Sequence, residues 1–319
     1  MVTSHNKLEK RKESNPMSTK DAIIKLMSGF TAETTPGSAK KVENFNDHLE
    51  QNSWVYVTFL PGSDLKDTIT LCKRLTNEGM RPIPHFAARS LASEAVLEDM
   101  LVQVTNEAGV ERVLTIAGGV SNKDIVGPFK TSMQLLETGL FDKYNIKTIA
   151  VAGHPEGSPD MSDEAIWDAV HWKNSFAERT DAKIHMVTQF CFEAEPIMAW
   201  DKKLNAAGNK MPVHVGLPGL ATIKTLISLA KASGVGPSMR FLTRQAMNVH
   251  KLVTVSDPNK QLTQLARYIS DTPNTNIEGI HMYPLGGLRR TAAWSYAVLR
   301  GDFTLQKENL GFKMNTDIK

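Results

Sequence analysis

One carboxylate in this sequence stands where an acid catalyst would be useful. Glu33 ends the apolar run 30–33 and is followed by Thr34, Thr35 and Pro36. If that run is a strand, the carboxylate reaches the edge where the strands end, and partial burial there disfavours the charged form of a carboxyl group. Such a group can act as a general acid. The alternative interpretation is a glutamate in a solvated loop.

Two histidines occupy comparable positions. His85 follows the extended segment 82–84, and His154 opens the sequence HPEGSPD. With Glu33 or Glu156 they would supply ligands for a metal ion, but no HxH or HExxH pair has the spacing of a metal site. We therefore expect no metal, and we expect both histidines to be hydrogen-bonded at the mouth of the fold.

The other candidate positions are uncharged. Gly118 and Gly119 follow the run 112–116, and glycines let a ligand approach the backbone closely. Ends of other runs carry small, hydroxyl, aromatic and amide side chains at Ala117, Thr58, Phe59, Gln189 and Tyr283. A rim that is polar but weakly charged suits a large planar heteroaromatic ligand better than a phosphate substrate or a metal ion.

The elements that must position these residues alternate along the chain. Short β-type apolar runs are expected at 30–33, 54–59, 81–86, 112–116, 147–152, 185–190, 213–217 and 279–283. Helical patterns accompany them at 39–51, 63–79, 91–108, 124–141, 162–179, 193–207, 220–233, 238–271 and 286–300. The connection after the seventh strand is long enough for two helices.

Eight βα units in this length predict an α/β fold, a single (β/α)8 TIM barrel whose active site lies at the C-terminal ends of the strands. A doubly wound open sheet is the alternative. It would normally carry a GxGxxG fingerprint after its first strand, and GFTAETTPGS does not match that pattern.

The sequence divides into three parts. Residues 1–20 are polar and highly charged and predict a disordered tail. Residues 21–305 hold the whole βα alternation without an internal linker, and residues 306–319 are expected to form a C-terminal tail.

Composition limits the partners. The 319 residues carry a formal net charge of +3, with 41% hydrophobic and 22% charged residues, which is too weakly basic for a nucleic-acid binder. No apolar stretch reaches the length of a membrane span, so neither nucleic acid nor membrane is an expected partner. The two cysteines, Cys72 and Cys191, lack disulfide or zinc-site spacing and favour a reducing, cytoplasmic compartment.

Five short motifs resemble the methylenetetrahydrofolate reductase family. They are FTAETTP at 30–36, VTF at 57–59, PHF at 84–86, VAGHPEGSPD at 151–160 and VTQFCFE at 187–193. The longest resembles the family's AGYPEGHPE and is the most specific. The motifs occur in order and at compatible spacing, and the resemblance covers nearly the whole chain after residue 29.

The resemblance implies a flavoprotein of one-carbon metabolism and methionine biosynthesis. FAD would exchange a hydride between 5,10-methylenetetrahydrofolate and 5-methyltetrahydrofolate, with NADH, NADPH or an electron-transfer partner as the other substrate, and a homo-oligomer is compatible with it. Glu33 corresponds to the general acid, and Gln189 and Tyr283 to substrate contacts. Positions at or beside the cofactor are Thr58, Phe59, His85, Ala117, Gly118, Gly119, Phe129, Ser132, His154, Glu156, Ser158, Asp168, His171 and Ser175. The last two share a helix face with Asp168, and in the family that face meets the FAD phosphates and ribose.

Departures from the family pattern affect charge near the cofactor. Ala117-Gly118-Gly119 stands where the family commonly has Arg-Gly-Asp. Loss of the carboxylate at 119 would raise the flavin potential and favour oxidation of the methyl group, whereas loss of the arginine at 117 works the other way. Flavin binding is expected to survive.

Other departures concern the ligand contacts. His154 and Ser158 replace tyrosine and histidine, and Ser175 stands where a lysine is expected, with Lys173 close by. The arginine expected to meet the folate tail aligns with Gly287, and the substitutes are Arg289 and Arg290. GVGPS at 234–238 and the long helical segment after it resemble a divergent bacterial branch of the family.

Two other functions remain open. One is a pterin-binding (β/α)8 methyltransferase that passes a methyl group to cobalamin, although such a barrel needs no counterpart of HPEGSP. The other is a non-catalytic folate- or flavin-binding subunit, which would not need to retain Glu33 and Gln189.

Overall fold

The computed structural model describes residues 17–119, 122–232, 252–307 and 311–318. Most of the predicted N-terminal tail (1–16), the GVGPS segment and the first part of the predicted helix 238–271 lie outside these ranges.

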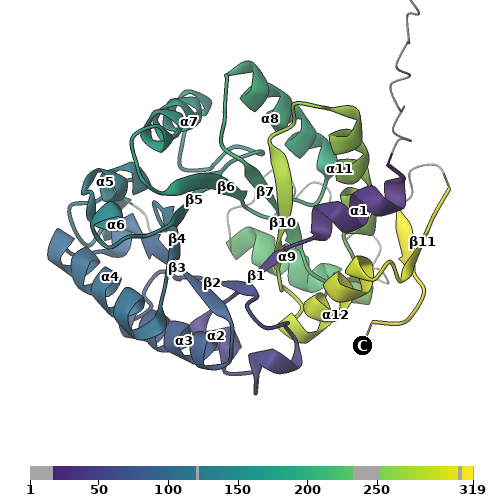
Figure 1. The fold of residues 1–319 in the computed structure, drawn as a ribbon, viewed down its shortest axis with the longest axis horizontal. Coiled ribbons are helices and arrows are strands. Elements are labelled where there is room, and N and C mark those ends of the chain that lie inside the picture. Colours follow the sequence, from purple (N-terminus) through teal and green to yellow (C-terminus); the bar gives the residue numbers. More distant parts are fainter. Residues whose placement is uncertain (1–16, 120–121, 233–251, 308–310, 319) are drawn as a thin grey trace, which may run out of the picture.

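Eight parallel strands close into a barrel, as Figure 1 shows at the centre of the ribbon, in the order β1-β10-β7-β6-β5-β4-β3-β2. The strands are β1 (Thr31–Thr34), β2 (Trp54–Val57), β3 (Arg81–Ala87), β4 (Arg112–Ile116), β5 (Thr148–Gly153), β6 (Lys183–Thr188), β7 (Val213–Pro218) and β10 (Ile277–Tyr283). The predicted (β/α)8 fold and all eight predicted strands are confirmed. Closure pairs Thr31 of β1 with His281 of β10.

Alternation along each strand explains why the barrel forms. Side chains on one face of the strands fill the interior, and those on the other face pack under the helices. The interior cluster consists of Tyr56, Ile83, Leu114, Ala150 and Val187. The outward-facing Val55, Val57, Val113, Ile149 and Val151 belong to the main core beneath the helices.

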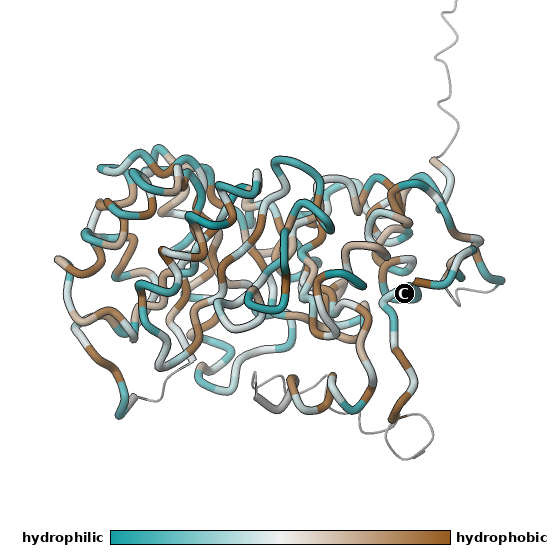
Figure 2. Tube along the Cα trace, turned by 90° about the horizontal axis from the view of Figure 1, so that it is seen from below, coloured by the Kyte–Doolittle hydropathy of each residue, from teal (hydrophilic) through white to brown (hydrophobic). Residues whose placement is uncertain are grey.

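An outer ring of helices covers the strands. It comprises α3 (Leu65–Asn77), α4 (Glu94–Ala108), α5 (Ser132–Glu137), α6 (Leu140–Lys143), α7 (Asp163–Ala177), α8 (Ala194–Ala206), α9 (Ile223–Ala232), α11 (Asn259–Asp271) and α12 (Leu288–Leu299). In Figure 2 hydrophobic and hydrophilic residues alternate along these helices, as expected when one face is buried. Within the described residues no helix is both long and apolar enough to cross a membrane. In the described part of the connection from β7 to β10 there are two helices, α9 and α11, as predicted.

The predicted helix at 39–51 is wrong. Only α2 (Pro36–Ala39) and a 3-10 turn (Phe45–Asp47) form there. The guanidinium of Arg74 donates to the carbonyls of Ala39, Val42 and Glu43, so these carbonyls are satisfied from α3 and not by helical hydrogen bonds.

The predicted helix at 124–141 is interrupted. It is replaced by a 3-10 turn (Asn122–Asp124) and the two short helices α5 and α6. At Gly127 a Cβ atom would lie 2.1 Å from the carbonyl oxygen of Leu91, so the chain passes too close to the β3–α4 loop for a helix there.

Both ends of the described chain pack on the barrel. Helix α1 (Thr19–Met27), which begins inside the predicted tail, lies against α11 and α12. Strands β11 (Phe303–Leu305) and β12 (Phe312–Met314) form an antiparallel hairpin, and the buried Phe312 belongs to the main core. The predicted C-terminal tail 306–319 therefore includes a strand. A second small pair joins β8 (Ala221–Thr222) to β9 (Val255–Ser256).

Candidate functional site

Glu33 lies at the mouth of the barrel beside a buried histidine. Its carboxylate Oε2 is 3.5 Å from Nε2 of His281, and the side chains are 15% and 1% exposed. Nδ1 of His281 lies 2.8 Å from the hydroxyl of Thr31, on the neighbouring strand. The carboxylate is thus partly open to the mouth on one side and backed by an imidazole on the other.

The negative charge of Glu33 raises the pKa values of three neighbouring aromatic side chains, those of His85, Tyr283 and Tyr56. Burial lowers the pKa of His85 to about 4, and the negative charge of Glu33 acts in the opposite direction. Burial also raises the pKa of Tyr283 and of Tyr56, and Glu33 adds to both effects. The structure therefore brings the predicted residues Glu33, His85 and Tyr283 together, with Tyr56 between them.

His85 differs from the expectation that it would be hydrogen-bonded. The side chain is 6% exposed, and neither ring nitrogen has a hydrogen-bond partner among the described residues. The buried hydroxyl of Thr58, just after β2, is also without one. Buried polar atoms without partners are costly, so two such groups at one mouth indicate a place for a ligand with polar edges.

Tyr283 and Gln189 lie on the side of the rim formed by β10, β7 and β6. The hydroxyl of Tyr283 donates to the carbonyl of Thr188 across the end of β7. Gly216 makes this possible, because a Cβ there would lie 2.7 Å from the tyrosine ring. Gln189 follows β6, is exposed, and its side-chain oxygen accepts from the backbone N–H of Phe190. Its amide nitrogen has no hydrogen-bond partner in the described part of the chain and is available to a ligand.

The turn after β4 is tightly packed at Gly118 and is flanked by an arginine. Gly118 has φ +97°, and a Cβ there would lie 3.3 Å from Cβ of Ala87 and 3.9 Å from Cβ of Arg89. The backbone N–H of Arg89 donates to Ala117. The Arg89 guanidinium donates to the carbonyl of Lys130 and lies 3.9 Å from the carboxylate of Asp160. Arg89, in the 3-10 turn Ala88–Ser90 after β3, thus adjoins the turn that lacks the family's arginine, and its guanidinium faces Lys130 and Asp160.

The HPEGSPD segment follows β5 and lies over a buried lysine. Nζ of Lys173, on α7, donates a 2.8 Å hydrogen bond to the carbonyl of Ala152. Burial lowers the pKa of Lys173 to about 8. Burial and the charge of Lys173 lower the pKa of His154 to about 4.

Two other side chains of the HPEGSPD segment have local contacts. Burial strongly raises the pKa of the Cys191 thiol, and the negative charge of the partly buried Glu156 adds to this effect. Ser158 accepts from the backbone of Asp160.

The remaining predicted contacts lie outside this cluster. Asp168, His171 and Ser175 form one exposed face of α7, opposite to Lys173. Phe59 and Phe129 are buried, at 6% and 7% exposure, and Ser132 is the buried first residue of α5. In the sequence Ser175 stands where the family's lysine is expected. In the structure Ser175 is exposed, and Lys173 is the residue of α7 that points inward.

Three residues near the mouth were not among the predicted contacts. His281 could have been found, because it lies two residues before Tyr283 and so on the same face of its strand. Lys173 stands among apolar residues on the buried side of a helical pattern. Arg89 has no such signal, because its position depends on how the β3 and β4 loops meet. Among the described residues no group of three or more histidine, cysteine or acidic side chains is arranged to hold a metal ion.

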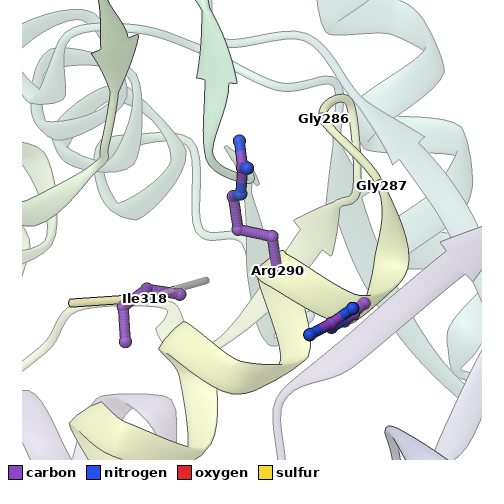
Figure 3. Close-up of a pocket in the computed structure, with 5 residues that line it drawn as sticks. Gly286, Gly287, Arg290 and Ile318 are labelled. Atoms are coloured by element: carbon purple, nitrogen blue, oxygen red, sulfur yellow. The ribbon is translucent and has the colours of Figure 1, made fainter. Parts of the chain in front are cut away.

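A pocket of about 590 Å³ adjoins the rim where β10 passes into α12. Gly286, Gly287, Arg289, Arg290 and Ile318 line it. Figure 3 shows Arg290 extending from the first turn of α12, with Ile318 of the C-terminal segment across from it. Neither arginine forms an ion pair with a described carboxylate. The pocket can therefore accept an anionic group.

Comparison with known proteins agrees with the motifs. Residues 26–286 match the model of the family described as Methylenetetrahydrofolate reductase. Over 167 residues the chain is 29% identical to Methylenetetrahydrofolate reductase 1 of Schizosaccharomyces pombe, a match that covers 50% of this chain and 26% of that protein. The chain thus spans about a quarter of the length of that relative.

One solved structure shares the fold over most of both chains. It is an uncharacterized protein from Clostridium thermocellum that binds two copies of 5-methyl-5,6,7,8-tetrahydrofolic acid. The TM-score is 0.53 and the identity 14%, over 88% of this chain and 98% of that one. At this identity the likeness concerns the fold alone. Because the family model matches from the end of α1 to the loop after β10, the chain belongs to the methylenetetrahydrofolate reductase family.

Proposed function

We propose that this protein is an FAD-dependent oxidoreductase that interconverts 5,10-methylenetetrahydrofolate and 5-methyltetrahydrofolate. The observation that carries the proposal is the partly open carboxylate of Glu33, backed by His281 and facing a mouth that also holds Gln189 and Tyr283. Reduction of the methylene bridge needs a proton at N10, where the bond to the bridging carbon breaks, and a hydride at that carbon. Glu33 would supply the proton in this direction and take it back in the other.

The mouth fits a flavin in three ways. His85 and Thr58 present buried polar atoms that lack partners among the described residues, and the exposed Gly119 lets a flat ligand approach the backbone. Arg89 and Lys173 provide buried or nearly buried positive charge for the diphosphate. When bound, FAD would supply the hydride-transfer chemistry that no side chain in this chain can perform.

The folate would lie against the side of the rim formed by β10, β7 and β6. Gln189 presents its amide nitrogen to the polar edge of the pterin, and Tyr283 with Phe190 forms an aromatic wall, their ring centroids 5.2 Å apart. Arg289 and Arg290 would meet the carboxylates of the folate tail in the adjoining pocket.

The charges near the β4 turn favour the methyl-oxidising direction. Gly119 places no carboxylate there, and the guanidinium of Arg89 faces the carboxylate of Asp160 at 3.9 Å, so the missing carboxylate at 119 is the difference that bears on the flavin. Since reduction adds negative charge to a flavin, the loss of a nearby carboxylate raises its potential. A flavin of higher potential is a better acceptor of the hydride from 5-methyltetrahydrofolate.

The absorbance spectrum of the purified protein tests this proposal. A flavin spectrum, either as purified or after adding FAD, is expected, with bleaching by 5-methyltetrahydrofolate and, separately, by NADH or NADPH. Protein that cannot be reconstituted with FAD contradicts the proposal and leaves the methyltransferase and the binding subunit.

The missing Arg-Gly-Asp charges favour one further candidate, a non-catalytic folate-binding subunit. Calorimetry with 5-methyltetrahydrofolate distinguishes it: folate binding without any flavin binding identifies the subunit. Folate binding together with flavin bleaching identifies the oxidoreductase.

A further inference from the structure

The imidazole of His281 connects two side chains at the seam of the barrel. Its Nδ1 lies 2.8 Å from the hydroxyl of Thr31, and its Nε2 lies 3.5 Å from Oε2 of Glu33. Thr31 and Glu33 both face the interior because they are two residues apart on β1. Both ring nitrogens are therefore directed at polar partners, in contrast to those of His85.

The surroundings hold this ring in place. Tyr56 packs edge-on against it with ring centroids 4.6 Å apart, and Tyr283 does so at 4.7 Å. Thr31 is 4% and His281 is 1% exposed. The titratable and charged groups that face Glu33 or His281 from the neighbouring strands are Tyr56 on β2, His85 on β3, His185 on β6, His214 on β7 and Tyr283 on β10.

We infer that Thr31 and His281 are positioning residues for Glu33. An ionised carboxylate oxygen can only accept, so the imidazole carries its proton on Nε2, facing Oε2 of Glu33, and its Nδ1 accepts from the threonine hydroxyl. The second carboxylate oxygen is then the one that carries the proton delivered to the substrate. This inference rests on the proposed role of Glu33 as the acid.

The arrangement has a direct chemical consequence. When Glu33 loses its proton to N10, the carboxylate charge develops beside an N–H that is already oriented toward it, so little rearrangement is needed. A separation of 3.5 Å is long for a hydrogen bond, and catalytic hydrogen bonds often tighten only when the substrate is bound.

Two matched pairs of variants test the inference in the FAD-loaded protein. Thr31→Val removes the hydroxyl and Thr31→Ser keeps it; His281→Leu removes the donor and His281→Gln keeps an amide near Nε2. The single-turnover rate with 5-methyltetrahydrofolate is measured across pH. We expect Thr31→Val and His281→Leu to slow it by about tenfold, equivalent to about 1.4 kcal/mol, and to move its pH profile. Thr31→Ser and His281→Gln should recover most of the rate and the profile.

The tautomer of His281 provides a second test that needs neither cofactor nor turnover. Nitrogen NMR of ¹⁵N-histidine-labelled apoprotein, with the His281→Gln spectrum for assignment, should show the proton on Nε2. In Thr31→Val this preference should weaken. A proton found on Nδ1 overturns the inference even if every variant folds.

The outcomes separate this inference from the proposed function. If wild-type protein binds no flavin, or if Glu33→Gln turns over normally, the proposed function has failed. If wild-type protein reacts, Glu33→Gln is inactive, and folded Thr31→Val keeps the wild-type pH profile, only the positioning role has failed. Equal loss in Thr31→Val and Thr31→Ser likewise contradicts it.

Discussion

The ammonium of Lys173 donates its hydrogen bond to the carbonyl oxygen of Ala152, between α7 and the end of β5. The side chain is 4% exposed, and no described carboxylate forms an ion pair with it. A cation without a counterion in such a place destabilises the free protein, and an arriving diphosphate would offset that cost.

Lys173→Met should therefore stabilise the apoprotein and weaken FAD binding. The folded pKa is about 8, below the ordinary value of 10.5, so the wild type gains stability as the pH rises from about 8 to 10.5. The stability of the variant should not rise over this pH range. At neutral pH its free energy of unfolding, measured with urea, should be about 1–3 kcal/mol larger than that of the wild type. Its Kd for FAD should be at least about tenfold weaker. Lys183→Met, at an exposed position, is the control and should change neither property.

Glu33→Gln should nearly abolish folate turnover while FAD stays bound. Loss of a general acid typically slows a reaction by roughly 10²–10⁴. Stopped-flow measurement of the reaction with 5-methyltetrahydrofolate gives the rate, and the flavin spectrum reports binding. Turnover at half the wild-type rate would show that another group is the acid.

Gln189→Ala should weaken folate binding more than it slows reduction of the flavin by the nicotinamide donor. The amide is exposed at the rim and is anchored through its oxygen to Phe190, so its nitrogen is the part available to the pterin. Loss of one hydrogen bond corresponds to about a tenfold weaker Kd. Equal damage to both half-reactions would place Gln189 at the flavin instead.

Mild acid should destabilise the apoprotein. Burial lowers the pKa of His85, His154 and His214 to about 4, against an ordinary value of 6.5. The unfolded chain binds protons first, so stability is lost as the pH falls from about 6.5 to about 4, by about 2 kcal/mol per histidine between about pH 7 and pH 5. Urea unfolding at both pH values measures the loss. His214→Gln should reduce it by one such increment, and His171→Gln, at an exposed position, should not.

Gly119→Asp should lower the flavin potential. Gly119 has an ordinary φ, and a Cβ would lie 3.7 Å from the ring of Pro61, so the substitution is sterically tolerated. A restored carboxylate disfavours the reduced flavin, and a change of about 30 mV in a two-electron couple corresponds to about 1.4 kcal/mol. A redox titration of both proteins decides the matter. An equal or higher potential in Gly119→Asp contradicts the electrostatic argument for the direction of the reaction.

How much the sequence predicts depends on whether a feature is local. The eight strands could be predicted because each barrel strand is buried on both faces and appears as a short apolar run. The helix at 39–51 could not be excluded, because the group that replaces its hydrogen bonds, Arg74, comes from another element. Helix α1 did have a local signal, since Ser18 caps it by accepting from the backbone of Asp21.

How much of the site could be predicted also depends on whether each feature has a local signal in the sequence. Glu33, His85 and Tyr283 could be predicted to converge because each stands at or near the end of a strand, and parallel strands end on one face. The contact between Arg89 and the Gly118 turn could not, because it depends on the side-chain positions of two neighbouring loops.

The seam between β1 and β10 joins residues 250 positions apart in the chain, at the contact of Thr31 with His281. Contacts of such long sequence separation form late when a domain folds, since the chain must close its largest loop first. Glu33 meets His281 only when the first and last strands of the barrel pair, so this contact exists only in the closed barrel. A substitution that loosens the pairing of β1 with β10 would therefore separate Glu33 from His281 even where the rest of the barrel keeps its fold.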